Sequence, residues 1–116
     1  GHDKFFHEQN AELARDELPK RFLVQKFTSF PPSDPFYGDT QKLLSYFDQG
    51  VSYVNFMGHG GGAVWADNLL FRFDDIRLLK NAPNYPIITS MTCFTAAFDS
   101  PSEVSCLGEQ LLKLDH

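Results

Sequence analysis

Val-Ser-Tyr-Val-Asn-Phe-Met-Gly-His-Gly-Gly-Gly, residues 51–62, is the stretch around which the chain is organised. Its first seven residues are uncharged and rich in β-branched and aromatic side chains, which predicts a buried strand. The glycine-rich run that follows predicts a turn. The strand therefore delivers one histidine, His59, into a turn at its carboxyl end.

A second apolar segment, residues 86–93, repeats this arrangement and ends in Cys93. Asp74 is placed to start a short helix between the two segments, and a helical connection is typical of parallel neighbouring strands. The carboxyl ends of parallel strands lie at one edge of the sheet, where open α/β sheets place their sites. We therefore expect His59 and Cys93 to face each other.

Periodicity and turn residues outline the neighbouring elements. An amphipathic pattern predicts a helix over residues 3–18, and the apolar residues 22–27 predict a short strand. The proline-rich residues 29–35 and, later, residues 63–68 are expected to be loops.

Capping residues predict two more helices. Asp39 is placed to cap a helix that Gly50 ends, with three residues facing inward: Leu43, Leu44 and Phe47. A serine, a proline and a glutamate predict the start of the last helix: Ser100, Pro101 and Glu103. Its apolar stripe comprises Val104, Leu107, Gly108, Leu111 and Leu112, and we interpret Cys106 as packing beside that stripe.

The order helix, strand, loop, helix, strand, helix, strand, helix predicts a single α/β layered domain over residues 1–116. A chain of this length with 42% hydrophobic residues can bury one core. Three predicted strands make a narrow sheet for so many helices. We therefore expect at least one further strand, N-terminal to Gly1, to be missing from this sequence or supplied separately.

Composition excludes several classes of function. A net charge of −5 and a pI near 5.2 argue against a nucleic-acid partner, and the apolar runs are too short for membrane insertion. Two cysteines, Cys93 and Cys106, do not make a disulfide framework, and a bridge between them would silence the thiol. Neither cysteine stands in a zinc-binding pattern, so we expect no metal and no cofactor. The sequence does not determine the oligomeric state.

The residues at the two strand ends suit thiol chemistry. A thiolate is the nucleophile of cysteine enzymes, and a nearby histidine can generate it. Because Gly60, Gly61 and Gly62 have no side chains, backbone amides near His59, together with the amide of Cys93, are free to approach a substrate carbonyl and stabilise an oxyanion. The residues alone leave other readings open: His59 as an ordinary turn residue, Cys93 as an inert core thiol, and Trp65 as either a pocket wall or a core residue.

A set of short motifs resembles the gingipain family of cysteine peptidases, which includes the type IX secretion sortases and is related to caspases, legumains and separases. The resemblance is strongest from Gly50 to Glu109. Its motifs, in order, are Gly50-Val51, residues 54–61, Ala63-Val64-Trp65, Asn81, residues 86–93, Phe98-Asp99 and Gly108-Glu109. The resemblance implies a caspase-like, flavodoxin-like three-layer α/β/α fold with a mainly parallel sheet, truncated at the N-terminus.

The same resemblance implies roles for individual residues. Cys93 becomes the nucleophile, His59 the general acid and base, the amides of Gly60 and Cys93 the oxyanion hole, and Trp65 and Gly61 the substrate contacts. The implied function is a secreted or cell-envelope cysteine-type endopeptidase that cleaves polypeptides through a thioester acyl-enzyme. Two alternatives are a sortase-like transpeptidase and a non-catalytic caspase-like binding module. Family members use structural calcium, but no such site can be placed in this sequence.

Overall fold

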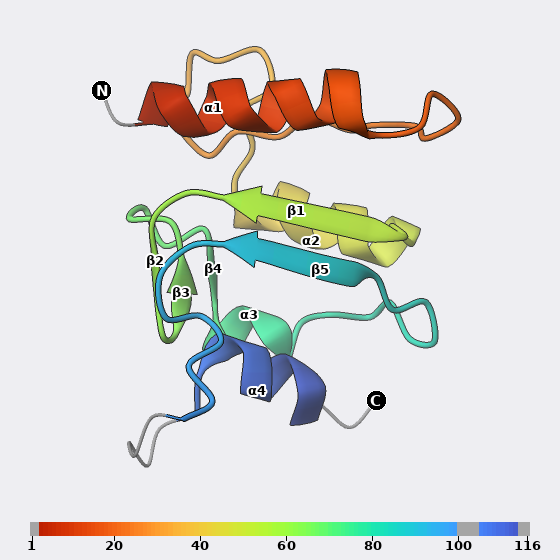
Figure 1. Cartoon of the computed structure of the whole chain (residues 1–116). Helices are drawn as coiled ribbons and strands as arrows, with labels where there is room; N and C mark the ends of the chain where they lie inside the picture. The colour runs from red at the N-terminus through yellow and green to blue at the C-terminus, as the bar shows by residue number, and fades with distance from the viewer. Residues whose placement is uncertain (1–2, 100–104, 114–116) are drawn as a thin grey trace.

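The computed structural model describes residues 3–99 and 105–113, and it confirms the α/β class (Figure 1). The elements in chain order are α1 (Asp3–Glu12), the π-helical turn η1 (Leu13–Glu17), α2 (Thr40–Gln49), β1 (Tyr53–Met57), β2 (Gly60–Gly61), β3 (Val64–Trp65), β4 (Phe71–Arg72), α3 (Phe73–Ile76), β5 (Ile87–Met91) and α4 (Leu107–Lys113). In the parts of the chain that the structure describes, no helix is long and apolar enough to cross a membrane.

The two strands predicted to carry the site are parallel neighbours. β1 pairs with β5 in a register that runs from Tyr53 opposite Ile87 to Met57 opposite Met91. The expected turn and loop that follow β1 are more regular than predicted, because β2, β3 and β4 form a small antiparallel sheet. Strands of two residues are too short to show the alternation by which a strand is recognised.

The core lies on one face of β1, between that strand and α2, α3 and α4. Its side chains are Leu43, Leu44, Phe47, Trp65, Leu70, Phe71, Ile76 and Leu107, none more than 8% exposed. Val54 and Phe56 reach this cluster from β1, and the Phe56 ring stacks on Trp65 with centroids 4.7 Å apart. The inward-facing residues predicted for α2 are thereby confirmed.

Caps fix the ends of α2 as the sequence predicts. The Asp39 carboxylate accepts a hydrogen bond from the Lys42 amide at 3.0 Å, which satisfies an amide of the first turn. Gly50 ends the helix with φ of 84°, a left-handed conformation that a side chain would strain. The helix therefore delivers the chain to the start of β1 at a defined point.

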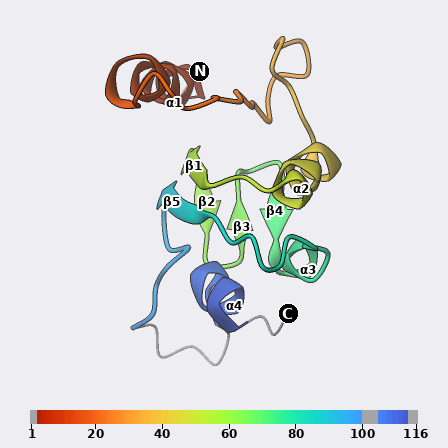
Figure 2. The same ribbon diagram turned by 90° about the vertical axis from the view of Figure 1, so that its right-hand side faces the viewer.

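α1 lies on the opposite face of β1 from α2 (Figure 2) and is held by polar contacts. The Asn55 side-chain amide donates to Asn10 Oδ1 at 2.7 Å, and Thr89 Oγ1 donates to Asn55 Oδ1 at 2.6 Å. The Tyr53 hydroxyl lies 2.7 Å from Thr89 Oγ1. Helices on both faces of the β1–β5 pair give the α/β/α layering that we expected.

The strand predicted at residues 22–27 is wrong. The segment forms neither helix nor strand: Phe22, Leu23 and Val24 are 44%, 89% and 40% exposed, and in the described chain it joins no ladder. Only Thr28, beyond the segment, makes an isolated bridge, to Tyr37. Strand propensity expresses packing against neighbouring strands, and here a neighbour is lacking.

Two helix boundaries differ from prediction. α3 begins at Phe73, and Asp75 rather than Asp74 caps it, because Asp75 Oδ2 accepts a hydrogen bond from the Arg72 amide at 2.8 Å. In α4 the Glu109 carboxylate accepts from the Cys106 amide at 2.8 Å. The predicted cap of the last helix, at Ser100, Pro101 and Glu103, and the first residue of its stripe, Val104, lie outside the described residues.

The predicted apolar stripe of α4 is wrong at its end. Leu107 is 1% exposed, whereas Leu112 is 80% exposed. Five positions of an α-helix correspond to about 500°, so a residue five places on points about 140° away from the first. A helix that contacts the core along one narrow face cannot bury both Leu107 and Leu112.

Candidate active site

His59 and Cys93 lie at equal distances along the chain beyond the paired strands. The last residues of the ladder, Met57 and Met91, are directly paired, and His59 and Cys93 each follow two residues later. The Gly58 amide continues the pairing by donating to the Met91 carbonyl at 3.4 Å. The expectation that both strands end at the same edge of the sheet is confirmed. Cys93 stands two residues after its strand, not at the end of it as predicted.

The glycine run after His59 packs closely against the residue before Cys93. A Cβ atom placed on Gly60 would collide with Thr92 Oγ1 and would lie 3.1 Å from the Val64 carbonyl oxygen. Gly60 also pairs with Trp65 in the β2–β3 hairpin. The absence of a side chain at Gly60 therefore accommodates Thr92, and the predicted space for a substrate remains a prediction.

Backbone hydrogen bonds fix the position of both loops. The His59 carbonyl accepts from the Ala66 amide at 2.8 Å, at the base of the β2–β3 hairpin. α4 ties the two loops together, since its Leu107 amide donates to Gly62 O at 2.6 Å and its Gly108 amide to Thr95 O at 2.8 Å. The segment that carries the imidazole and the segment that carries the thiol therefore share one support.

The chain turns sharply after the thiol. Cys93 is exposed and unbridged, and Phe94, the next residue, has φ of 56°. A left-handed conformation costs a residue with a side chain about 1–2 kcal/mol, and such strain often accompanies functional sites. Thr95 then returns to the interior, where it is 5% exposed. The result is a thiol at the tip of a strained, anchored turn.

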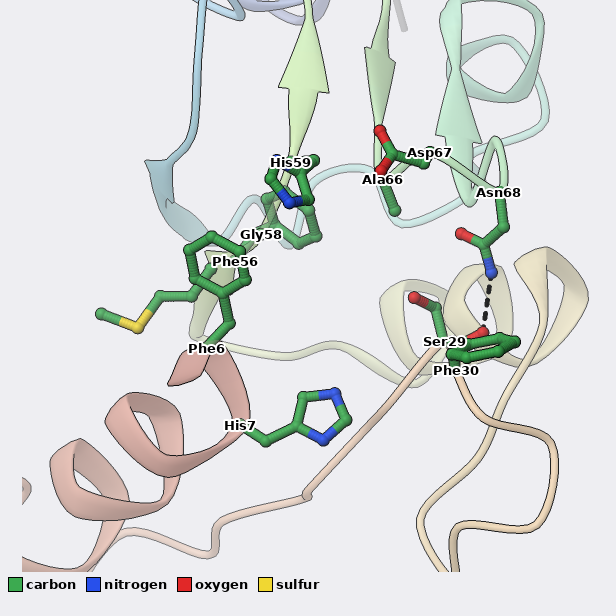
Figure 3. Close-up of a pocket in the computed structure, with 11 residues that line it drawn as sticks. Phe6, His7, Ser29, Phe30, Phe56, Gly58, His59, Ala66, Asp67 and Asn68 are labelled. Carbon is green, nitrogen blue, oxygen red and sulfur yellow. Dashed lines mark hydrogen bonds between the residues drawn. The ribbon is translucent and has the colours of Figure 1, made fainter. Parts of the chain in front are cut away.

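The imidazole of His59 lies beside a small cavity. The ring of Phe6, in the first turns of α1, meets the His59 ring edge-on, with centroids 5.2 Å apart and an interplanar angle of 88°. A cavity of about 360 Å³ adjoins this contact (Figure 3) and includes Phe30, Phe56 and Asp67 in its lining. The Asn68 side chain closes one side by donating to the Ser29 carbonyl at 2.7 Å.

Trp65 and Cys106 belong to the interior. Trp65 is 2% exposed and packs between Phe56 and Phe71, which is the core alternative for this residue and not the pocket wall. Its indole nitrogen has no hydrogen-bond partner among the residues that the structure describes. Cys106 is 5% exposed and unbridged, so its predicted packing role is confirmed.

Within residues 3–99 and 105–113, no group of three or more His, Cys, Asp or Glu side chains is placed to hold a metal ion.

The family-model comparison agrees with this arrangement. Residues 1–115 match the model of peptidase family C25. The chain belongs to this family. It is 30% identical to Lys-gingipain of Porphyromonas gingivalis over 83 residues, which cover 72% of this chain and 4% of that protein. Lys-gingipain W83 of the same organism is 33% identical over 70 residues, which cover 60% of this chain and 4% of that protein.

A solved structure shares the fold. The crystal structure of the Arg-specific cysteine proteinase gingipain R aligns with a TM-score of 0.61 and 24% identity, covering 69% of this chain and 18% of that one. This likeness shows that the C25 chain has the fold of a cysteine proteinase. The expected resemblance to gingipains is confirmed, and the chain spans only a small part of the length of these relatives.

Two residues of the site escaped the sequence analysis. Phe6 lies on the apolar face of a predicted helix, but nothing in the sequence pairs that helix with His59. Thr92 was read as an ordinary strand residue, although its hydroxyl is buried, without a partner among the described residues, and directed at Gly60. The contact between the Thr92 hydroxyl and Gly60 can be recognised only when the pairing register of β1 and β5 is known.

Proposed function

We propose that this C25 domain carries the Cys–His dyad of a cysteine endopeptidase, with Cys93 as the nucleophile and His59 as the general acid and base. The observation that carries the proposal is the register of β1 and β5, which brings both residues to one edge at equal offsets. The shared anchoring of their loops by α4 and the exposure of Cys93 support it further.

The reaction follows from these groups. His59 takes the proton of the Cys93 thiol, and the thiolate attacks the scissile carbonyl carbon to form a C–S bond. The amides of Gly60 and Cys93 donate to the resulting oxyanion. His59 then gives its proton to the leaving nitrogen, the C–N bond breaks, and a thioester remains. Water, deprotonated by His59, attacks the thioester, and the acid product leaves as the C–S bond breaks.

The substrate in this proposal is a polypeptide. Gly61 offers backbone without a side chain next to the dyad, and the cavity beside His59 supplies a partly aromatic recess for one substrate side chain. Trp65 contributes from beneath by supporting the hairpin through its packing on Phe56. A secreted or cell-envelope location, as the gingipain resemblance implies, is part of the proposal.

Labelling of the thiol tests the dyad. The full-length gene product is treated with a peptidyl vinyl sulfone, and the modified residue is found by mass spectrometry. We expect labelling at Cys93 and hydrolysis of a mixed peptide library. Cys93→Ala abolishes both, and His59→Ala slows both by at least about 100-fold, the usual share of a general acid–base group.

Cys106→Ala is the matched control, because it removes the other thiol, which is buried. It should leave labelling and hydrolysis unchanged. Peptide hydrolysis that survives Cys93→Ala, or a His59→Ala variant that labels at the wild-type rate, would overturn the dyad.

A further inference from the structure

Three residues with side chains adopt a left-handed backbone conformation within residues 3–99 and 105–113: Ala66 (φ 64°), Leu69 (φ 58°) and Phe94 (φ 56°). The first two lie in the connection between β3 and β4, where backbone hydrogen bonds account for the conformation. The Ala66 amide donates to His59 O at 2.8 Å, and the Leu69 amide donates to Ala66 O at 3.1 Å. Phe94 differs, because neither its amide nor its carbonyl makes a backbone hydrogen bond in these described residues.

The turn at Phe94 is imposed by the segments on either side of it. Met91 is held in the ladder with β1. Thr95 is 5% exposed, and its carbonyl accepts from the Gly108 amide at 2.8 Å. The chain between these fixed points passes Cys93 and turns at Phe94. A glycine adopts a left-handed conformation without the steric penalty, so the turn by itself does not require phenylalanine.

Packing does not explain the phenylalanine either. Phe94 is 73% exposed, a larger fraction than any other aromatic residue in the described part of the chain. A side chain that is left in water contributes little of the stabilisation that burial gives. Backbone strain that folding does not require is typical of functional sites, where the surrounding structure holds it in place. The ring of Phe94 is therefore available to a molecule that binds beside the thiol.

The backbone of Phe94 lies beside the groups of the proposed dyad. Phe94 follows Cys93 directly, and consecutive Cα atoms are about 3.8 Å apart. A Cβ atom placed on Gly62 would lie 3.9 Å from the Phe94 carbonyl oxygen, so the Phe94 backbone adjoins the glycine run after His59. An extended peptide advances about 3.3 Å per residue. A polypeptide whose scissile carbonyl reaches the Cys93 sulfur therefore passes Phe94 within about two residues of the scissile bond.

We propose that the Phe94 ring is a specificity-determining contact of the peptidase, packing against an apolar side chain of the substrate within about two residues of the scissile bond. The inference rests on the proposed function and adds the class of substrate side chain that the site selects. A phenyl ring has no hydrogen-bond donor or acceptor, so it gains most from burying aliphatic or aromatic surface. Peptides with an aliphatic or aromatic residue at that position are preferred.

Cleavage of a mixed peptide library by the full-length gene product tests this contact. Mass spectrometry of the products should show aliphatic and aromatic residues enriched at one fixed position near the cut. Phe94→Gly removes the ring and relieves the left-handed strain, so the variant folds. It should lose the enrichment, and kcat/KM for the preferred peptides should fall at least about tenfold through a higher KM, a discrimination typical of apolar contacts.

Two variants control for the ring and for its position. Phe94→Tyr keeps an aromatic ring at the turn and should retain the preference. Phe98→Ala is the matched control, since Phe98 is also exposed, at 57%, but has no positive φ and stands further from Cys93 in the sequence. It should leave the cleavage profile and kcat/KM unchanged.

Iodoacetamide separates the substrate contact from the dyad, because this small reagent presents no substrate side chain to Phe94. The rate of its reaction with Cys93, and the pH dependence of that rate, should be the same in the wild type and in Phe94→Gly. A slower or pH-shifted reaction in the variant would mean that Phe94 acts on the thiol and not on the substrate, which would overturn the inference.

The library also distinguishes failure of this inference from failure of the proposed function. An unchanged cleavage profile in Phe94→Gly, with hydrolysis that still depends on Cys93, would overturn the contact and leave the dyad intact. Hydrolysis that survives Cys93→Ala would overturn the proposed function and this inference with it.

Discussion

On one face of β1, Val54 and Phe56 pack into a core whose side chains are at most 8% exposed. On the other face, Asn55 donates a hydrogen bond to Asn10 of α1, the Tyr53 hydroxyl pairs with Thr89 of β5, and a cavity lies beside these contacts. The candidate site depends on the face of β1 that carries the core. The β2–β3 hairpin and α4, which hold the loops of His59 and Cys93, are both anchored in that core through Trp65 and Leu107. The comparison teaches that the edge carrying His59 and Cys93 is supported mainly from the densely packed face of β1.

The largest difference between the two faces of β1 should appear when an aromatic ring is removed from the core. Phe71 is 0% exposed, so Phe71→Ala should lower the free energy of unfolding by about 3–5 kcal/mol. Leu23, in residues 22–27 beside the cavity, is 89% exposed, so Leu23→Ala should change the free energy of unfolding by less than about 0.5 kcal/mol. Urea unfolding followed by circular dichroism measures both. Similar losses would mean that residues 22–27 are packed after all.

Adding a methyl group at Gly60 tests the packing between the loop that carries His59 and the loop that carries Cys93. Gly60→Ala places a methyl group against Thr92 and should cost about 1–3 kcal/mol of stability, the usual effect of overpacking. Gly61→Ala is the matched control, since its Cβ would make only an ordinary 3.7 Å contact with Val64. Thr92→Ala should recover part of the stability that Gly60→Ala loses, since the close contact with the Val64 carbonyl oxygen remains. Failure of that rescue would show that the loops are not in contact there.

Removing the contact between Phe6 of α1 and the His59 ring tests whether α1 contributes to the site. An edge-on aromatic pair contributes about 0.5–1.5 kcal/mol, so Phe6→Ala should slow labelling of Cys93 by about two- to tenfold through a less ordered His59. Phe6→Tyr keeps the ring and should label at the wild-type rate. The rate constant with the peptidyl probe is the measurement, and an unchanged rate for Phe6→Ala would remove α1 from the site.

Relieving the strained turn should have the smallest effect. Phe94 adopts φ of 56°, so Phe94→Gly should raise the free energy of unfolding by about 0.5–1 kcal/mol after the added freedom of glycine in the unfolded chain is subtracted. Phe98→Gly, at a similarly exposed residue without positive φ, should instead lower it. Thermal unfolding compares the two. A loss in Phe94→Gly would indicate that the side chain is stabilising.

The sequence predicted the parts of the fold whose signals are local. The caps at Asp39 and Gly50 and the two apolar strands are recognisable because each depends on residues within a few positions. Residues 22–27 failed because a strand requires a partner that the sequence does not specify. Leu112 failed because helical periodicity gives the faces of a helix but not the width of the contact.

The site was predictable to the extent that it follows from the parallel order of two strands. His59 and Cys93 are brought to one edge as expected, and Cys106 packs as expected. The contacts of Phe6 and Thr92 were not predictable, because they join segments whose separation in the sequence carries no pattern. Trp65 lies in the core because its ring stacks on Phe56, a pairing that depends on the unpredicted hairpin.

The pairing of Met57 with Met91 sets the relative position of the two strand ends that lead to His59 and Cys93. The connection between the strands also has a structural role, because it supplies Leu70, Phe71 and Ile76 to the core. A slip of the ladder by a single residue would turn the residues that follow one strand toward the opposite face of the sheet, and His59 and Cys93 would no longer stand at equal offsets.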